Sequence, residues 1–216
     1  MNPVTSTTTR RQLLAEMLAG AGALSLFAGA ASAASSNMAA SASATDASLN
    51  PSTAGITAKS GIKLPTGDIH DFDFFVGNWN FVNRRLKKRW VGSKDWEVFP
   101  ASLRCENRMN GVVNIDEGVF PTKGWSGMTL RVFHLEKRQW SLYWINSSRG
   151  EMLAPVVGGF TGDRGVFYGD DIDDGRPIVC RYEWTRLGPD AAHWAQAFSH
   201  DGKEWETNWI IEHTRA

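Results

Sequence analysis

The chain of 216 residues is 42% hydrophobic and 21% charged, a composition typical of a globular protein with one domain or a small pair of domains. Its 23 basic and 23 acidic side chains cancel, which argues against nucleic acid or an anionic membrane surface as a partner. Ten tryptophans, all between Trp79 and Trp209, predict a heavily aromatic core or an aromatic-lined cavity.

Residues 1–33 have the features of an export signal peptide. The pair Arg10 and Arg11 precedes an apolar stretch of about a dozen residues, and small residues follow at 31–33. This stretch is too short for a comfortable membrane span, so we expect cleavage and no stable membrane anchor. Residues 9–14 resemble the twin-arginine translocation pattern, with ordinary secretion as the alternative. We therefore expect a periplasmic or secreted protein.

Residues 34–67 are rich in Ala, Ser and Thr, and no aromatic residue occurs between Phe27 and Phe72. Such a segment buries too little apolar surface to offset the entropy lost on ordering, so it is predicted to be a disordered linker. The folded domain is then predicted to cover residues 68–216.

From Phe72 onward, apolar and polar residues alternate between turn signals such as Asn110-Gly111 and Asp174-Gly175. The pattern predicts about ten β-strands, over residues 76–90, 96–109, 112–120, 125–134, 139–147, 152–160, 164–170, 176–187, 192–199 and 204–214. Because the connections are short, neighbouring strands should pair antiparallel, and closure hides the sheet edges. We predict an all-β fold, a single antiparallel up-and-down β-barrel of about eight to ten strands; a two-sheet sandwich is the alternative.

The first predicted strand contains Gly77-x-Trp79 within FDFFVGNWNF, and the last one ends at Arg215. These features resemble the calycin superfamily, which includes lipocalins, fatty-acid-binding proteins and nitrobindin-like barrels. Residues 72–215 look like an uncharacterised bacterial family of exported calycin-like domains. The resemblance implies that Trp79 closes one end of the barrel, that Arg215 packs across it, and that a ligand enters from the opposite end.

Two cysteines, Cys105 and Cys180, lie within predicted strands. In an exported protein they can form a disulfide, or they can remain two buried thiols. Both alternatives are compatible with the sequence.

Motifs of common catalytic classes are missing from the sequence, which has no G-x-S-x-G, P-loop, H-E-x-x-H or C-x-x-C. The acidic run GDDIDDGR lacks EF-hand spacing and predicts an exposed hairpin tip, so we predict neither a metal site nor a cofactor. His213 shares a strand face with Trp209 and Arg215. Since nitrobindin-like barrels supply a haem ligand from the C-terminal strand, the resemblance makes His213 the candidate ligand if haem is bound.

Polar and aromatic residues at strand centres are candidate lumen residues, because an inward charge needs a partner or a ligand. The candidates for catalysis are Glu117, Glu183 and Arg131. The candidates for ligand binding are Arg104, Trp140, Tyr143, Trp144, Trp184 and Asn208. For residues 112–120, the alternation does not decide whether Asp116 or Glu117 points inward.

These residues favour a protein that binds a small hydrophobic or amphipathic molecule in an aromatic-lined lumen. One alternative is a barrel enzyme with isomerase- or lyase-like acid–base chemistry, in which a lumen carboxylate works beside an arginine. Another is an interaction protein that uses an apolar patch on the outer wall. The sequence makes no prediction of the oligomeric state.

Overall fold

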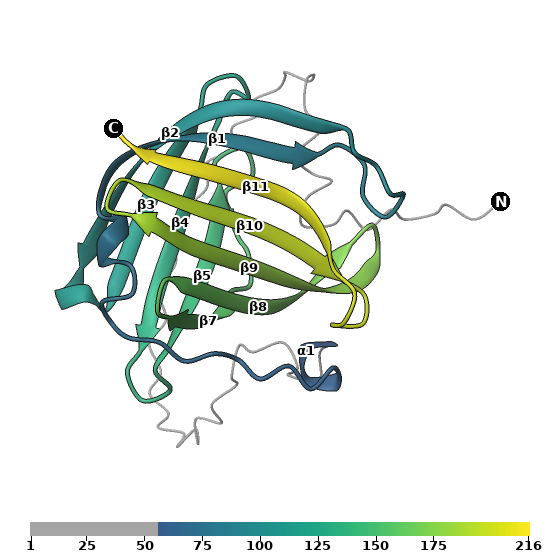
Figure 1. Ribbon diagram of the computed structural model, residues 1–216, viewed down its shortest axis with the longest axis horizontal. Helices are drawn as coiled ribbons and strands as arrows, with labels where there is room; N and C mark the ends of the chain where they lie inside the picture. The colour runs from purple at the N-terminus through teal and green to yellow at the C-terminus, as the bar shows by residue number, and fades with distance from the viewer. Residues whose placement is uncertain (1–55) are drawn as a thin grey trace, which may run out of the picture.

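The computed structural model describes residues 56–216, in which ten antiparallel strands form a closed β-barrel (Figure 1). The strands are β1 (Gly77–Leu86), β2 (Trp96–Arg108), β3 (Val113–Phe120), β4 (Trp125–His134), β5 (Gln139–Asn146), β6 (Glu151–Met152), β7 (Val156–Thr161), β8 (Arg164–Asp173), β9 (Arg176–Gly188), β10 (Ala191–Ser199) and β11 (Glu206–Arg215). The ring closes because β1 pairs with both β2 and β11, while β4 pairs with β5. The predicted signal peptide, residues 1–33, lies outside the described residues, as does the linker up to residue 55.

Helical structure in the described residues is confined to short segments. These are α1 (Ile56–Lys59) and the 3-10 helices η2 (Asp73–Phe75) and η3 (Met109–Gly111). No helix within residues 56–216 combines the length and the apolar character needed to cross a membrane.

The predicted all-β barrel is confirmed, and β4 occupies the predicted range 125–134 at both ends. The single strand predicted over 152–160 is wrong, because the chain there forms β6 and β7 with Pro155 between them. Proline has no backbone N–H to donate to the ladder, which disfavours continued pairing at Pro155. The two-residue β6 pairs with β5 beside the ring of ten.

Strand β1 shows how alternation places the core. Its residues Trp79, Phe81 and Asn83 are buried, and their neighbours on the other face are exposed. The turn between β8 and β9 has positive φ at both Asp174 (50°) and Gly175 (74°). An Asp-Gly pair tolerates this conformation, whose twist matches that of the paired strands.

One end of the barrel is closed by the contact between the first and last strands. The Arg215 guanidinium lies 4.3 Å from the centroid of the Trp79 ring, which confirms the predicted contact. Trp79 Nε1 donates a hydrogen bond to the Phe75 carbonyl (2.8 Å), and Arg215 Nη1 donates one to the Val76 carbonyl (3.0 Å). A Cβ at Gly77, where φ is +122°, would lie 2.8 Å from Arg215 Nη1. Glycine thus provides both the backbone turn and the space for the arginine.

The chain preceding β1 runs along the outside of the barrel from α1 to η2 (Figure 1). Thr57 donates two hydrogen bonds to Asp170 of β8, one from its backbone N and one from Oγ1, both of 2.7 Å. Gly67 N donates to the Arg138 carbonyl (2.7 Å) and packs against Gly159. The last part of the predicted linker, from Thr57 onward, therefore contacts the barrel. We call residues 60–76 the N-terminal arm.

Cys105 and Cys180 are both buried, and no disulfide joins them. The Cys105 thiol lies 3.4 Å from Asn114 Oδ1. Burial raises the pKa of Cys105 to about 11, so its thiol stays protonated at neutral pH. Of the two alternatives, the structure has the buried thiols.

Candidate functional site

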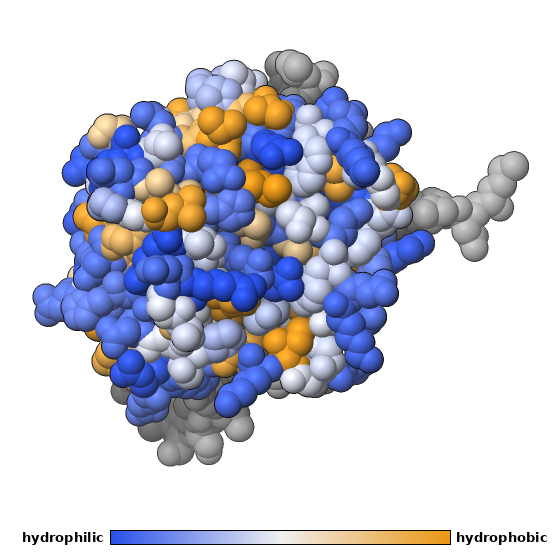
Figure 2. All heavy atoms as spheres, viewed as in Figure 1, coloured by the Kyte–Doolittle hydropathy of each residue, from blue (hydrophilic) through white to orange (hydrophobic). Residues whose placement is uncertain are grey.

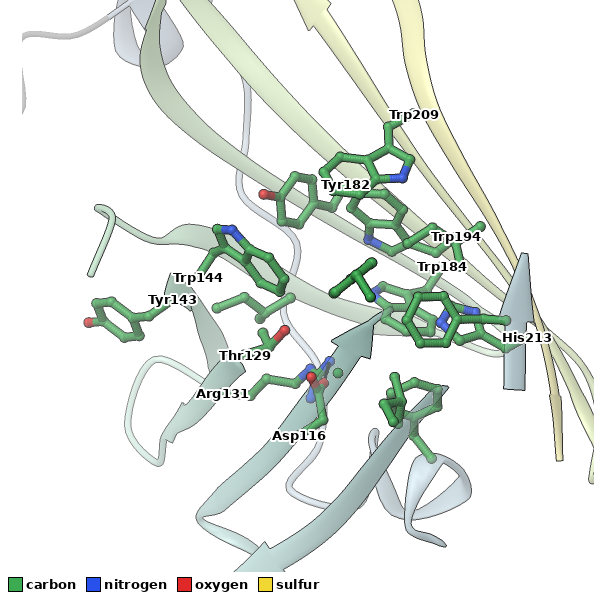
Figure 3. Close-up of a pocket in the computed structure, with 17 residues that line it drawn as sticks. Asp116, Thr129, Arg131, Tyr143, Trp144, Tyr182, Trp184, Trp194, Trp209 and His213 are labelled. Carbon is green, nitrogen blue, oxygen red and sulfur yellow. Dashed lines mark ion pairs between the residues drawn. The ribbon is translucent and has the colours of Figure 1, made fainter. Parts of the chain in front are cut away.

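The barrel interior contains a cavity of about 80 Å³ enclosed mainly by aromatic side chains (Figure 3). Eight strands contribute to its wall, and Phe75 of η2 forms part of its floor. The residues that line it are Phe75, Phe81, Leu103, Asp116, Gly118, Phe120, Thr129, Arg131, Leu142, Tyr143, Trp144, Tyr182, Trp184, Trp194, Trp209, Ile211 and His213.

Aromatic side chains from β9, β10 and β11 form one wall of the cavity. The ring centroids of Tyr182 and Trp194 lie 4.9 Å apart, and those of Trp194 and Trp209 lie 5.9 Å apart, in edge-on arrangements. Such pairs fix each other's orientation. This wall therefore presents rigid ring surfaces to the lumen.

Trp144 of β5 forms the facing wall, and it is half-buried. Its indole lies directly on Gly127 of β4, where a Cβ would overlap the ring. Half-buried Tyr182 and Ile211 also line the cavity. Thr129 and Tyr143 are the other half-buried polar or aromatic residues of the lining, so the cavity is less enclosed on the side of these five residues than at its fully buried wall.

A single ion pair lies among the aromatic residues. Arg131 Nη2 contacts Asp116 Oδ2, and the two side chains are 3% and 5% exposed. Arg131 Nη1 also donates a hydrogen bond to Asn114 Oδ1 (2.8 Å). The guanidinium lies 4.8 Å from the Phe72 ring centroid and 5.4 Å from that of Phe75. Pairing and these ring contacts offset the cost of burying two charges.

His213 is buried with aromatic rings on both of its faces. Its ring stacks on Phe81 and on Trp184, with centroids 5.3 Å away in each case. Burial lowers the pKa of His213 to about 3, and the positive charge of Arg131 acts in the same direction. The imidazole is therefore neutral at physiological pH.

The residues around His213 do not fit haem. Pockets for drug-sized ligands measure roughly 300–1,000 Å³, and the cavity of about 80 Å³ is far smaller. The packed rings of Phe81 and Trp184 also occupy the space on both sides of the imidazole. We derive no function through haem.

Five of the predicted site residues line the cavity, namely Arg131, Tyr143, Trp144, Trp184 and His213. Two others are buried elsewhere in the barrel. Trp140 packs edge-on against Phe72 with centroids 5.2 Å apart and belongs to the core beneath the cavity. Asn208 accepts a hydrogen bond from Gln196, away from the cavity lining.

The predicted lumen positions of Arg104 and Glu117 are wrong. The Arg104 side chain is 78% exposed, and Glu117 is also exposed. On β3 it is Asn114, Asp116 and Gly118 that face inward. The alternation of apolar and polar residues along β3 could not decide which face points inward, because the outward face also carries apolar residues, Ile115 and Val119.

The predicted lumen position of Glu183 is wrong, whereas Tyr143 is among the residues that line the cavity. Glu183 lies on the outer wall, where it pairs with Arg164 (2.6 Å), because its neighbours Tyr182 and Trp184 face the lumen. Tyr143 points away from the other labelled residues in Figure 3.

Among the lining residues whose side chains carry a polar atom, sequence analysis assigned no site role to Thr129, Tyr182, Trp194 and Trp209, and it left open whether Asp116 or Glu117 faces inward. For Trp194 and Trp209 the signal was the excess of tryptophan in strands. Tyr182 could have been inferred from Trp184, since residues two apart on a strand share a face. Thr129 and Asp116 carry no comparable signal.

The acidic run forms the β8–β9 hairpin, whose tip at Asp174 and Gly175 is exposed as predicted, whereas Asp173 is buried. Asp173 is 2% exposed and accepts hydrogen bonds from Arg89 Nε (2.9 Å) and Trp90 Nε1 (2.8 Å). Asp170 binds Thr57, as described above. Within residues 56–216, no group of three or more His, Cys, Asp or Glu side chains is arranged to hold a metal ion.

No protein-family model and no curated protein matches the chain. Among solved structures, the chain is similar to a protein of unknown function from the DUF3598 family of Nostoc punctiforme PCC 73102. The match has 9% sequence identity and a TM-score of 0.36, and it covers 70% of this chain and 50% of that one. At this TM-score the similarity carries no functional argument.

Proposed function

We propose that this β-barrel binds a small, largely apolar molecule in its lumen. The observation that carries the proposal is the cavity itself, in which tryptophans 144, 184, 194 and 209 surround a space that protein side chains leave unfilled. Protein interiors are close-packed, and a void of this size lowers the free energy of unfolding. A ligand that fills the cavity would explain why the protein tolerates that cost. Concave apolar sites with a few placed polar groups are typical of ligand pockets.

The cavity volume limits the size of the ligand. A cavity of about 150 Å³ holds benzene, and the volume here is about 80 Å³. A ligand with one ring therefore requires a small displacement of half-buried Trp144 toward solvent. We propose a single-ring or short-chain amphipathic ligand.

We further propose that the barrel is calycin-like, on the basis of Gly77, Trp79 and the Arg215 contact across the closed end. The ligand then enters away from Trp79, on the side where Trp144 and Tyr182 meet solvent. The residues 1–33 support a proposal that the protein works in the periplasm or is secreted. Cell fractionation and the mass of the mature chain test that location.

Binding is favoured over acid–base catalysis by the placement of the carboxylates. Glu117 and Glu183, the two candidate acids, lie on the outer wall. Asp116 lines the cavity but is paired with Arg131. A role for an apolar patch on the outer wall gains no support from the face seen in Figure 2, where hydrophobic residues occur in small groups separated by hydrophilic ones.

The substitution Gly118→Ala tests the proposed site. A Cβ at Gly118 would project into the lumen in ordinary contact with the Phe120 ring, at 3.4 Å. The added methyl group should raise the free energy of unfolding by about 0.5–1 kcal/mol and lower the affinity for toluene about tenfold, as measured by thermal unfolding and calorimetry.

The matched control for this experiment is Val119→Thr, at the adjacent exposed position of β3. It should leave toluene binding unchanged. If neither toluene nor phenol binds the wild-type protein saturably, the proposed function is wrong. Equal toluene affinity in wild type and Gly118→Ala would place the site elsewhere.

A further inference from the structure

Four cavity-lining residues have a buried polar atom without a hydrogen-bond partner among the described residues, and two of these atoms, Nε of Arg131 and Oδ2 of Asp116, belong to the ion pair. The other two are Nε1 of Trp184 and Nδ1 of His213, and each belongs to a residue that is 4% exposed. The rings of the two residues stack with centroids 5.3 Å apart, so both atoms belong to the same wall. Buried polar groups in native proteins are nearly always paired, and an exception calls for a specific explanation.

The chemical roles of the two atoms are fixed by their surroundings. The indole N–H of Trp184 can only donate. The imidazole of His213 hydrogen bonds to the backbone of Ala192, and since Nδ1 is the nitrogen without a partner, Nε2 makes that bond. A proton on Nε2 leaves a lone pair on Nδ1 of the neutral ring. The wall therefore offers one donor and one acceptor.

The charges that face the cavity cancel. Arg131 is paired with Asp116, and it donates a further hydrogen bond to Asn114. The other titratable group near His213 is His193, whose Nδ1 lies 2.8 Å from Glu212 Oε1 on the outer wall. An ionic ligand would lose its hydration without finding an unpaired counter-charge, so the cavity favours a neutral one.

We infer that the ligand is a neutral molecule with a hydroxyl group, which donates a hydrogen bond to Nδ1 of His213 and accepts one from Nε1 of Trp184. A hydroxyl group suits this wall because it combines one donor with two acceptor lone pairs. The apolar remainder of the ligand packs against Phe81, Phe120 and Trp144, which also line the cavity. Phenols and small alcohols are the matching chemical classes. This inference rests on the proposed function and adds the polarity and charge of the ligand.

Three probes of similar size separate these properties: phenol, toluene and benzoate. Calorimetry on the full-length protein at pH 7 should show phenol binding at least tenfold more tightly than toluene, and benzoate binding should not be detected. The indole N–H resonance of Trp184 should move downfield with phenol and stay nearly fixed with toluene, because only phenol supplies an acceptor.

Variants of His213 and Trp184 test whether these two side chains cause the preference for phenol over toluene. His213→Phe and Trp184→Phe should each reduce phenol affinity to about that of toluene while toluene still binds. The control His193→Gln changes a histidine on the outer wall and should leave the phenol preference intact. Circular dichroism and thermal unfolding verify that the variants are folded.

The outcomes distinguish the inference from the proposed function. Equal affinities for phenol and toluene would overturn the inference and leave lumen binding in place. Tight binding of benzoate would overturn the neutral character of the ligand. A Trp184 indole resonance already at its hydrogen-bonded position without any probe would mean that a resident water satisfies the wall, which also overturns the inference. Failure of all three probes to bind would overturn both.

Discussion

At the scale of single residues, the site depends on buried polar groups that only their immediate neighbours stabilise. His213 is neutral because aromatic rings exclude water from it, and Asp116 is tolerated because Arg131 contacts it. Neither property follows from residue type. His213 could be singled out from its strand face, whereas the choice between Asp116 and Glu117 required the inward face of β3.

Replacing His213 by Phe should reduce the loss of stability in acid. Burial holds the pKa of His213 at about 3 in the folded protein, below the value of about 6.5 expected when unfolded. The unfolded state therefore takes up the proton first, and stability that is complete above pH 6.5 is lost as pH falls toward 3. His213→Phe should lower the slope of unfolding free energy against pH by up to about 1.4 kcal/mol per pH unit. Urea unfolding at pH 7, 6, 5 and 4 measures it, and identical slopes would contradict the buried neutral imidazole.

The Asp116–Arg131 pair should be costly to break and much less costly to remove. Asp116→Asn leaves the buried Arg131 charge without its counter-ion and should cost about 3–5 kcal/mol in urea unfolding. The double variant Asp116→Leu with Arg131→Met should recover most of this loss. Asp95→Asn, in the exposed pair with Lys87, serves as the control and should cost less than about 1 kcal/mol. Equal effects of Asp116→Asn and Asp95→Asn would show that the lumen pair is hydrated.

At the scale of elements, the strands were predictable because alternation and turn chemistry are local signals. Strand β4 and the Asp174-Gly175 turn are examples. The break between β6 and β7 was not predictable from Pro155 alone, because Pro100 and Pro177 lie within β2 and β9. The N-terminal arm was not predictable from its composition, because its packing depends on the distant glycine Gly159.

The arm should be released by Gly159→Ala. A Cβ at Gly159 would lie 2.5 Å from Gly67 N and 2.5 Å from the Thr66 carbonyl carbon, so the arm must move outward. Hydrogen exchange of the Gly67 amide, which is bonded to Arg138 in the wild type, should become faster while the amides of β1 stay protected. Val157→Ala, at the half-buried position two residues earlier on the same face of β7, is the control because it adds no atom that would displace the arm. Unchanged Gly67 protection in Gly159→Ala would contradict the packing described here.

At the scale of the whole molecule, closure could be predicted because a meander of about ten strands must cover its edges. The contact of Arg215 with Trp79 could be predicted from the family resemblance. The size of the aromatic-lined cavity could not be predicted, because its volume of about 80 Å³ is the small difference between the volume of the barrel interior and the volume of the many side chains that fill it. The tryptophans lie together because of the order and register of the strands, and this arrangement cannot be inferred from the spacing of the tryptophans along the chain.

The most direct test of ligand binding in the lumen is a crystal structure of the protein soaked with phenol. We expect one phenol ring in the cavity beside Trp144, with its oxygen at hydrogen-bond distance, roughly 2.7–3.2 Å, from Nδ1 of His213 and Nε1 of Trp184. A lumen that holds only side chains and water at saturating phenol would contradict the account.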